Sequence, residues 1–273
     1  MSAMRKVTVN TDSDLREAIA ALGRPVSPVA SPPPPLSPLP PLSPSPPPAS
    51  PPTTPEQRGD AIASALHHFL DLMLKWTRVY NLTAITDRKQ MITHHLVDSL
   101  AIIPSLDRLL AGQDHPRLLD VGTGAGLPGI PMAVARPDWR LTLVDSNSKK
   151  AAFVTQVTAE LGLTNVTVIT GRIEQLERHE QHQPRLQPLD QSHHTTAATY
   201  NAIVSRAFAS LNDFVTGTRH LLAYDGTWVA MKGAVPQSEI DALPDEIACV
   251  AIVPLDVPGL DAERHLILMK EKR

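Results

Sequence analysis

The stretch "DVGTGAGLPG", Asp120 to Gly129, decides how the chain around it is interpreted. It follows the apolar pair Leu118 and Leu119, precedes the apolar run "IPMAVA" and contains four glycines. A tight turn between a strand and a helix needs one or two glycines, whereas four allow backbone to lie directly against a ligand. We therefore predict a strand that ends at Val121, a ligand-binding turn, and a helix from Leu127 to Ala135.

Two kinds of ligand fit such a turn. Gly124 to Gly129 matches G-x-G-x-x-G, and Asp145 follows Gly124 by 21 residues, as in nicotinamide and flavin dinucleotide sites. The turn, however, begins at Gly122 directly after a strand that ends with the acidic Asp120. This order is typical of S-adenosylmethionine sites, where Asp145 would accept hydrogen bonds from the ribose hydroxyls. The pattern favours a methyltransferase, of RNA or of a small molecule, over an NAD-binding oxidoreductase.

Downstream of Arg117, short β-branched strands alternate with helical stretches, which predicts a parallel sheet with helices on both faces. Further helices are expected from Ser148 to Gly162, capped by Ser148, and from Ser210 to Leu222. The last two strands are joined by too few residues for a crossover helix and should form an antiparallel hairpin. The fold class predicted is α/β, a Rossmann-like seven-stranded methyltransferase sheet with an N-terminal helical extension. The expected strands are "RLLDV", "RLTLVD", "VTVITG", "YNAIVSR", "TWVAMKG", "CVAIVPL" and "HLILM".

The first part of the chain has a different composition. Residues 25–55 hold 16 of the 27 prolines and predict a disordered, polyproline-like linker. Residues 1–24 are expected to be an appendage with one short helix. Residues 56–110 should be helical and packed on the core, with Ile62, Leu66, Phe69, Met73 and Trp76 on one face of the first helix and a second helix from Lys89 to Ile103. Residues 111–273 form the predicted methyltransferase domain, interrupted at 178–199 by a polar, histidine-rich loop insertion.

Composition limits the classes of function. A net charge of −3 argues against nonspecific coating of nucleic acid. We expect a cytoplasmic protein without membrane contact or an obligate protein partner, and a monomer. The single cysteine, Cys249, lies in an apolar run and indicates a buried thiol rather than a nucleophile. The histidines of the insertion are irregularly spaced and lack an accompanying cysteine or carboxylate cluster, so no metal site is predicted.

Several motifs together resemble one family. They are "KWTRVYNLTAITD", "HHLVDSL", "LLDVGTGAGLPGIPMA", "LVDSNSKKAAFVTQV", "VSRAFASLNDF", "WVAMKG" and "ERHLILMK". This set resembles the RsmG (GidB) family of bacterial methyltransferases of small-subunit ribosomal RNA, from about Gln57 to Lys270. The resemblance implies transfer of a methyl group from S-adenosylmethionine to N7 of one guanine in the decoding-region loop of 16S rRNA, free or in a small-subunit particle. It implies cofactor contacts at Gly122, Leu127, Ile173, Glu174 and Arg206, beside Gly124 and Asp145.

No general base is expected, because guanine N7 carries a lone pair and no proton. Alignment of the reacting atoms and orientation of the base are the remaining tasks. The candidates to position the base are Arg206, Asn81, His95, Asp98 and Lys232. A buried salt bridge is the alternative for Arg206, and an exposed side chain is the alternative for Lys232. His95 and Asp98 are three residues apart on one helix face and can hydrogen-bond to one another, and a structural pair between helix and sheet is favoured for them over lining of the substrate pocket. The resembling family usually has arginine at the position of His94. Lys75, Arg78, Arg88, Lys89, Lys149 and Lys150 are expected to form a basic rim.

Overall fold

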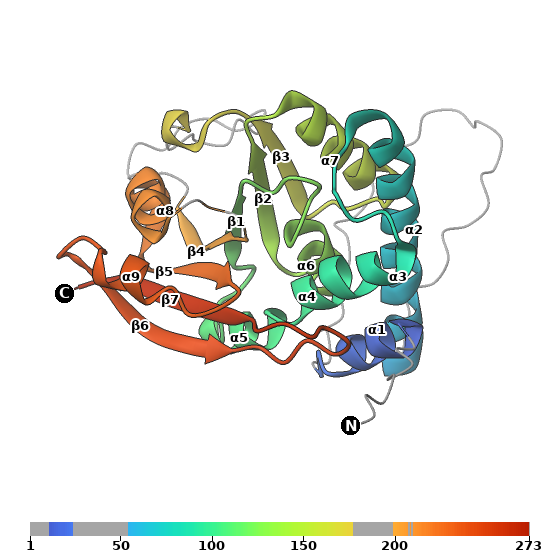
Figure 1. The fold of residues 1–273 in the computed structure, drawn as a ribbon, viewed down its shortest axis with the longest axis horizontal. Coiled ribbons are helices and arrows are strands. Elements are labelled where there is room, and N and C mark those ends of the chain that lie inside the picture. Colours follow the sequence, from blue (N-terminus) through green and yellow to red (C-terminus); the bar gives the residue numbers. More distant parts are fainter. Residues whose placement is uncertain (1–10, 24–53, 177–198, 207, 209, 273) are drawn as a thin grey trace, which may run out of the picture.

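The computed structural model describes residues 11–23, 54–176, 199–206, 208 and 210–272. Within them, seven strands form one sheet in the order β3-β2-β1-β4-β5-β7-β6 (Figure 1). The first five strands in chain order are parallel, and β7 is antiparallel to both β5 and β6. The predicted seven-stranded α/β sheet and its terminal hairpin are confirmed. The strands are β1 (Arg117–Val121), β2 (Arg140–Asp145), β3 (Val166–Thr170), β4 (Tyr200–Ser205), β5 (Leu222–Lys232), β6 (Ile247–Pro254) and β7 (His265–Glu271).

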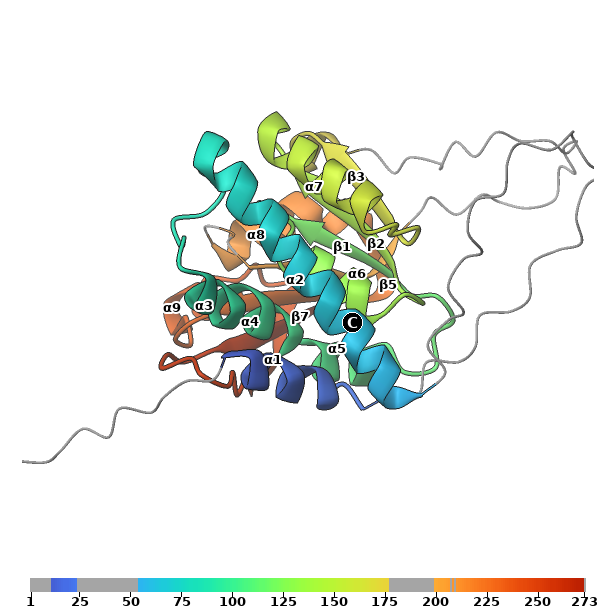
Figure 2. The ribbon, with the colours of Figure 1, turned by 90° about the vertical axis from the view of Figure 1, so that its right-hand side faces the viewer.

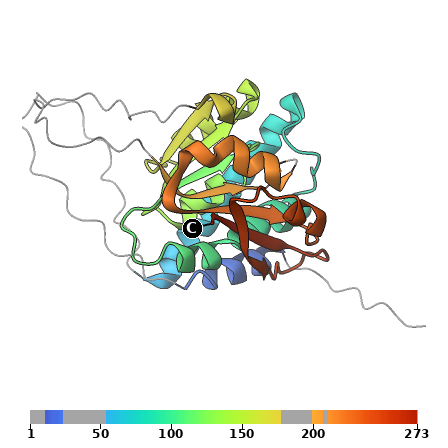
Figure 3. The ribbon, with the colours of Figure 1, turned by 90° about the vertical axis from the view of Figure 1, so that its left-hand side faces the viewer.

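Alternate residues of the central strands point into two separate cores, one on each face of the sheet. On β1, Leu118 belongs to one core and Leu119 to the other. The first core is covered by α1, α2, α6 and α7 (Figure 2), and the second by α8 (Figure 3). Because both faces are covered, the ligand-accessible part of the sheet is the edge where the parallel strands end.

The helices differ from the sequence prediction mainly at their ends. Residues 123–128 form the glycine turn, so α6 begins at Gly129 rather than Leu127. Asn147 rather than Ser148 caps α7, since its side chain accepts from the backbone N–H groups of the first turn. Ser210 caps α8 as predicted. The bounds are α1 (Thr11–Ala20), α2 (Pro55–Tyr80), α3 (Arg88–Met91), α4 (Asp98–Leu100), α5 (Ile103–Leu109), α6 (Gly129–Ala135), α7 (Ser148–Glu160), α8 (Leu211–Thr218) and α9 (Gln237–Asp241).

Helix α2 is the long helix predicted from the apolar stripe. Thr54 and Gln57 form a capping box at its N-terminus, and Asn81 ends it in the left-handed conformation. Leu66, Phe69 and Met73 are fully buried in the first core. The helix therefore crosses the sheet face with its C-terminal end beside α7 and the loop to α3 (Figure 2).

The second predicted helix, Lys89 to Ile103, is not a continuous α-helix. Its centre is the π-helix η1 (Ile92–Val97), between α3 and α4, and a turn separates α4 from α5. A π-helix closes its hydrogen bonds over five residues rather than four and is therefore wound more widely, so side chains three apart no longer share one face as they would in an α-helix. This changes the partners of the polar residues that the segment carries.

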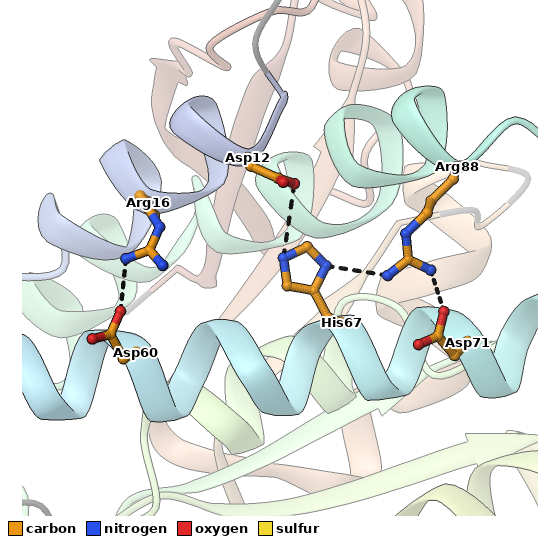
Figure 4. Close-up of polar contacts among 6 residues, drawn as sticks. All are labelled: Asp12, Arg16, Asp60, His67, Asp71 and Arg88. Carbon is orange, nitrogen blue, oxygen red and sulfur yellow. Dashed lines mark hydrogen bonds and ion pairs between the residues drawn. The ribbon is translucent and has the colours of Figure 1, made fainter.

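Helix α1 is part of the folded body. Its Leu15 is fully buried in the first core, and Ile19 and Leu22 are nearly so. Figure 4 shows its polar side facing α2: Arg16 pairs with Asp60 at 2.6 Å, and Asp12 lies 3.8 Å from Nε2 of His67. The segment expected to be an appendage thus contributes to the core.

Smaller helical turns complete the described fold. They are the 3-10 helices η2 (Ile173–Gln175) and η3 (Arg219–Leu221). The predicted linker, 25–55, lies outside the described residues except at its last two positions, and the predicted insertion, 178–199, lies outside them except for Thr199. None of the described helices combines the length and apolar character needed to cross a membrane.

Candidate active site at the carboxyl ends of the central strands

The glycine turn is fastened to the end of the neighbouring strand. The backbone N–H groups of Gly122 and Thr123 both donate to the carbonyl of Val144, at 2.9 and 3.0 Å. Gly122 and Gly124 have φ values of 68° and 59°, in the left-handed region that glycine adopts without strain. The turn is therefore a fixed surface at the ends of β1 and β2.

Asp120 is the centre of this turn. Its Oδ2 accepts from Thr123 Oγ1 at 2.7 Å and from the N–H of Gly129 at 2.9 Å. Its Oδ1 is buried and has no hydrogen-bond partner among the described residues. Burial raises the pKa of Asp120 to about 6, although the two hydrogen bonds and the charge of Arg206 oppose the rise. A buried acceptor of this kind favours a ligand that donates a hydrogen bond or carries positive charge.

Open space lies above the first two glycines. A Cβ added at Gly122 would meet nothing within 4 Å, and one at Gly124 would meet only a carbonyl at 3.9 Å. Asp145, at the end of β2, borders the same turn: its Oδ2 accepts from Gly124 N and its Oδ1 from Asn147 N, each at 2.8 Å. Each oxygen keeps acceptor capacity for a further donor. The open turn with two carboxylates fits a ligand that carries an ammonium group and ribose hydroxyls, as S-adenosylmethionine does.

Leu127, Ile173 and Glu174 are further predicted cofactor residues, the first in the glycine turn and the other two in η2. Leu127 is buried in the first core and Ile173 in the second. Glu174 is exposed and lies beside α8, with Oε1 3.8 Å from where a Cβ on Gly217 would be. Ser205 Oγ donates to the carbonyl of Val121 at 3.1 Å, which joins the end of β4 to the start of the glycine turn.

A hollow of about 380 Å³ lies beside the glycine turn, where β4 and β5 end. The π-helix η1 and the start of α4 form its opposite wall. Four of the five base-positioning candidates line it together. Its lining residues are Ile85, His94, His95, Asp98, Arg206, Met231, Lys232, Gly233 and Arg264.

Two arginines share one buried carboxylate in this hollow. Arg264 Nε donates to Asp98 Oδ1 at 2.8 Å, and Arg206 Nη1 lies 3.7 Å from Asp98 Oδ2. Arg206 also donates to the carbonyl of His94 at 3.3 Å. Burial lowers the pKa of the Arg206 guanidinium, and the carboxylates of Asp98 and Asp120 oppose this. Since two cations face one carboxylate, this part of the hollow is suited to an acceptor-rich or anionic group.

The predicted hydrogen bond between His95 and Asp98 is wrong. His95 Nε2 is instead 2.9 Å from Thr83 Oγ1, and its Nδ1 has no partner among the described residues. Burial, followed by the charge of Arg206, lowers the pKa of His95 to about 4. The imidazole is therefore neutral at pH 7 and does not attract the carboxylate, which pairs with the arginines.

Lys232 has a side-chain partner in the structure, and Asn81 lies outside the hollow. Lys232 Nζ donates to both carboxylate oxygens of Glu239, at 3.1 and 2.9 Å, so its ammonium is already paired. Asn81 ends α2 and does not line the hollow with the other candidates. It lines a separate one of about 700 Å³, together with Thr77, Arg78 and Thr83.

Arg264, which lines the hollow, and Glu239, which pairs with Lys232, were not among the predicted residues. Arg264 lies in "ERHLILMK", one of the quoted motifs, which was the available signal, but its partner Asp98 is 166 residues away. Glu239 belongs to the short helix α9, which no sequence pattern indicated. Among the described residues, no three His, Cys, Asp or Glu side chains gather as metal ligands would.

A seven-stranded Rossmann-like sheet, a glycine turn after β1 and acids at the ends of β1 and β2 define the class of protein: it is an S-adenosylmethionine-dependent methyltransferase. Residues 62–267 match the family model described as rRNA small subunit methyltransferase G. The chain belongs to this family, and the oxidoreductase alternative is wrong.

Curated relatives carry the same description. The ribosomal RNA small subunit methyltransferase G of Leptothrix cholodnii is 49% identical over 213 residues, 78% of this chain and 88% of the relative. That of Laribacter hongkongensis is 45% identical over 202 residues, 74% of this chain and 86% of the relative. Among solved structures, TrmN from Thermus thermophilus has a TM-score of 0.46 at 17% identity and covers 66% of this chain and 53% of its own.

Proposed function

We propose that the chain transfers the methyl group of S-adenosylmethionine to N7 of one guanine in the decoding-region loop of 16S rRNA. The observation that carries the proposal is the match of residues 62–267 to the family, with the glycine turn and its two carboxylates intact. The relatives are named for small-subunit ribosomal RNA. N7 and the decoding-region position follow from the family resemblance of the quoted motifs.

The proposed cofactor site consists of the open turn and its surroundings. Gly122 and Gly124 would lie against the methionine and ribose portions, and the unpartnered Oδ1 of Asp120 would face the ammonium group. Asp145 would accept from the ribose hydroxyls through its remaining lone pairs. Leu127, Ile173 and Glu174 would border the adenosine, and Arg206 would separate the cofactor from the hollow.

When bound, S-adenosylmethionine supplies a methyl group on a sulfonium, which the in-plane lone pair of guanine N7 attacks without losing a proton. The chain therefore has to align the base rather than deprotonate it, and alignment can lower the barrier by on the order of 7–11 kcal/mol. In the hollow, Arg206 would donate to guanine O6, an acceptor beside N7. The neutral His95 adds no positive charge against the sulfonium.

The test is transfer of tritium from labelled S-adenosylmethionine into 16S RNA. The RNA is extracted, alone and as small-subunit particles, from cells that lack the gene. Label should enter 16S RNA of the deletion strain and not the already modified RNA of the parent, and it should map to a single 7-methylguanosine. Persistence of that nucleotide in the deletion strain would falsify the assignment of the substrate. Transfer only into small metabolites would favour the small-molecule alternative.

A further inference from the structure

The C-terminal end of α2 exposes apolar side chains that the fold does not need on its surface. Val79 is 69% exposed and Tyr80 is 44% exposed, two of the six exposed large hydrophobic residues in the described chain. An exposed aromatic beside unpaired cations is characteristic of surfaces that bind single-stranded nucleic acid. The end of this helix is therefore a candidate for contact with a partner.

The ring of Tyr80 packs against the ring of Trp76. The two ring centroids lie 5.0 Å apart, and Trp76 Nε1 donates to Gln156 Oε1 on α7 at 3.0 Å. Trp76 also contacts Phe153 of α7, with ring centroids 5.5 Å apart. Because these contacts anchor the end of α2 to α7, the Tyr80 ring is preorganised and would lose little conformational freedom on stacking.

The position of Tyr80 places it at the rim of the methyl-transfer site. Lys149 Nζ is 5.6 Å from the centre of the Tyr80 ring. Lys149 is in the first turn of α7, directly after the Asn147 cap that hydrogen-bonds to Asp145. On the other side of the helix end, the 700 Å³ hollow contains Arg78 and Thr83, and Thr83 contacts His95. The helix end thus lies near both the glycine turn and the 380 Å³ hollow that His95 lines.

The positive charges near Tyr80 favour an anionic ligand. Within the described residues, no hydrogen bond or ion pair engages the side chains of Arg78, Lys149 or Lys150. Arg88, which the sequence also placed in the basic rim, is bound to Asp71 (Figure 4). S-adenosylmethionine carries a sulfonium and would be repelled by free cations, whereas RNA phosphates would be attracted. The chemistry fits a strand of RNA.

We propose that Tyr80 stacks a nucleobase flanking the target guanine, while Arg78, Lys149 and Lys150 contact the neighbouring phosphates. On docking, the base displaces the Lys149 ammonium from the ring, and the ammonium moves to a phosphate. The inference rests on the proposed function, because it assigns a surface for the same RNA substrate. It identifies where the strand lies on either side of the methylated nucleotide.

The test compares Tyr80→Ala with Tyr80→Phe, which keeps the ring. Tyr80→Ala should raise the KM for 16S RNA roughly tenfold or more, as expected for loss of one base–aromatic stack, with little change in kcat. Tyr80→Phe should behave like the parent. The Kd for S-adenosylmethionine, measured by calorimetry, should be the same in all three proteins. Thermal unfolding of each variant shows that the fold is retained.

Lysine and arginine variants test the phosphate contacts. Lys149→Gln and Arg78→Gln should each reduce the slope of log K against log salt for RNA binding by about 0.7 to 0.9. Arg140→Gln is the matched control, because Arg140 is exposed at the opposite end of β2 and should leave the slope unchanged.

An unchanged KM in folded Tyr80→Ala overturns the inference, and so does weaker S-adenosylmethionine binding with unchanged RNA binding, which would assign the ring to the cofactor. Failure of the parent protein to methylate 16S RNA would instead count against the proposed function itself.

Discussion

Asp120 Oδ2 accepts a hydrogen bond from the backbone N–H of Gly129 at 2.9 Å, and this bond closes the glycine turn from its first acid to its last glycine. There is no room for a side chain at that contact. A Cβ on Gly129 would lie 2.7 Å from the same carboxylate oxygen and 2.5 Å from Leu143 Cδ2. The fourth glycine of the motif is thus required by packing, whereas Gly122 and Gly124 leave space for a ligand.

We expect Gly129→Ala to destabilise the protein by about 1–3 kcal/mol, the usual cost of overpacking a tight core. The measurement is urea unfolding monitored by tryptophan fluorescence. Gly171→Ala is the matched control, since a Cβ there meets nothing within 4 Å and its φ lies outside the left-handed region. Equal unfolding midpoints for the two variants would contradict the close approach at Gly129.

Asp120 should make stability fall as the pH rises. Its pKa in the folded protein is about 6, above the ordinary 3.8. The stabilisation from proton uptake is therefore fully present below about pH 3.8 and is lost as the pH rises through 6. Asp120→Asn keeps an acceptor for Thr123 and Gly129 but cannot ionise. At pH 8 it should raise the free energy of unfolding of the ligand-free protein by up to about 3 kcal/mol.

Urea titrations of both proteins at pH 4 and pH 8 check this expectation for Asp120. The difference in free energy of unfolding between Asp120→Asn and the parent should grow with pH. If the two proteins show the same pH dependence, the carboxylate is ionised in the folded state without cost, and an ammonium-binding role for its Oδ1 loses support.

His95 should have the opposite pH dependence. Its pKa of about 4 lies below the ordinary 6.5, so its contribution to stability is present above pH 6.5 and is lost as the pH falls through 4. In NMR spectra, the His95 imidazole, assigned by its absence from His95→Gln, should remain neutral between pH 8 and pH 5. A titration midpoint near 6.5 would show that the hollow is more hydrated than its contacts indicate.

The glycine turn and the seven strands were predictable because they depend on local pattern: small residues in sequence, and β-branched runs between helical stretches. The contacts inside the hollow were not. A spacing of three residues suggested that His95 and Asp98 bond to one another, but their partners are Thr83, 12 residues away, and Arg264, 166 residues away. A spacing of three residues indicates neighbouring side chains only on a regular α-helix. Here His95 lies in the π-helix η1 and Asp98 begins α4, and both side chains bond to residues elsewhere in the fold.

The packing of helix α1 was likewise not predictable from local sequence. Its sequence predicts a short helix, but nothing local shows that Leu15 would be fully buried against helices more than 40 residues away. We expect Leu15→Ala to destabilise the protein by about 2–5 kcal/mol, as for other core truncations. Glu17→Ala, an exposed change on the same helix, should have little effect. Equal stability of the two variants would mean that α1 does not pack on the body in solution.

Lys232 lies at the end of β5, where its position in the sequence suggested contact with RNA. Its ammonium is paired with Glu239, whose Oε2 also accepts from the backbone N–H of Leu211 at 2.8 Å. Lys232→Met would leave this partly buried carboxylate without its cation and should cost about 1–3 kcal/mol of stability. The salt dependence of RNA binding should stay that of the parent, unlike the reduced slope expected for Lys149→Gln. A slope reduced by one full phosphate contact in Lys232→Met would instead show that the lysine leaves Glu239 for the RNA backbone.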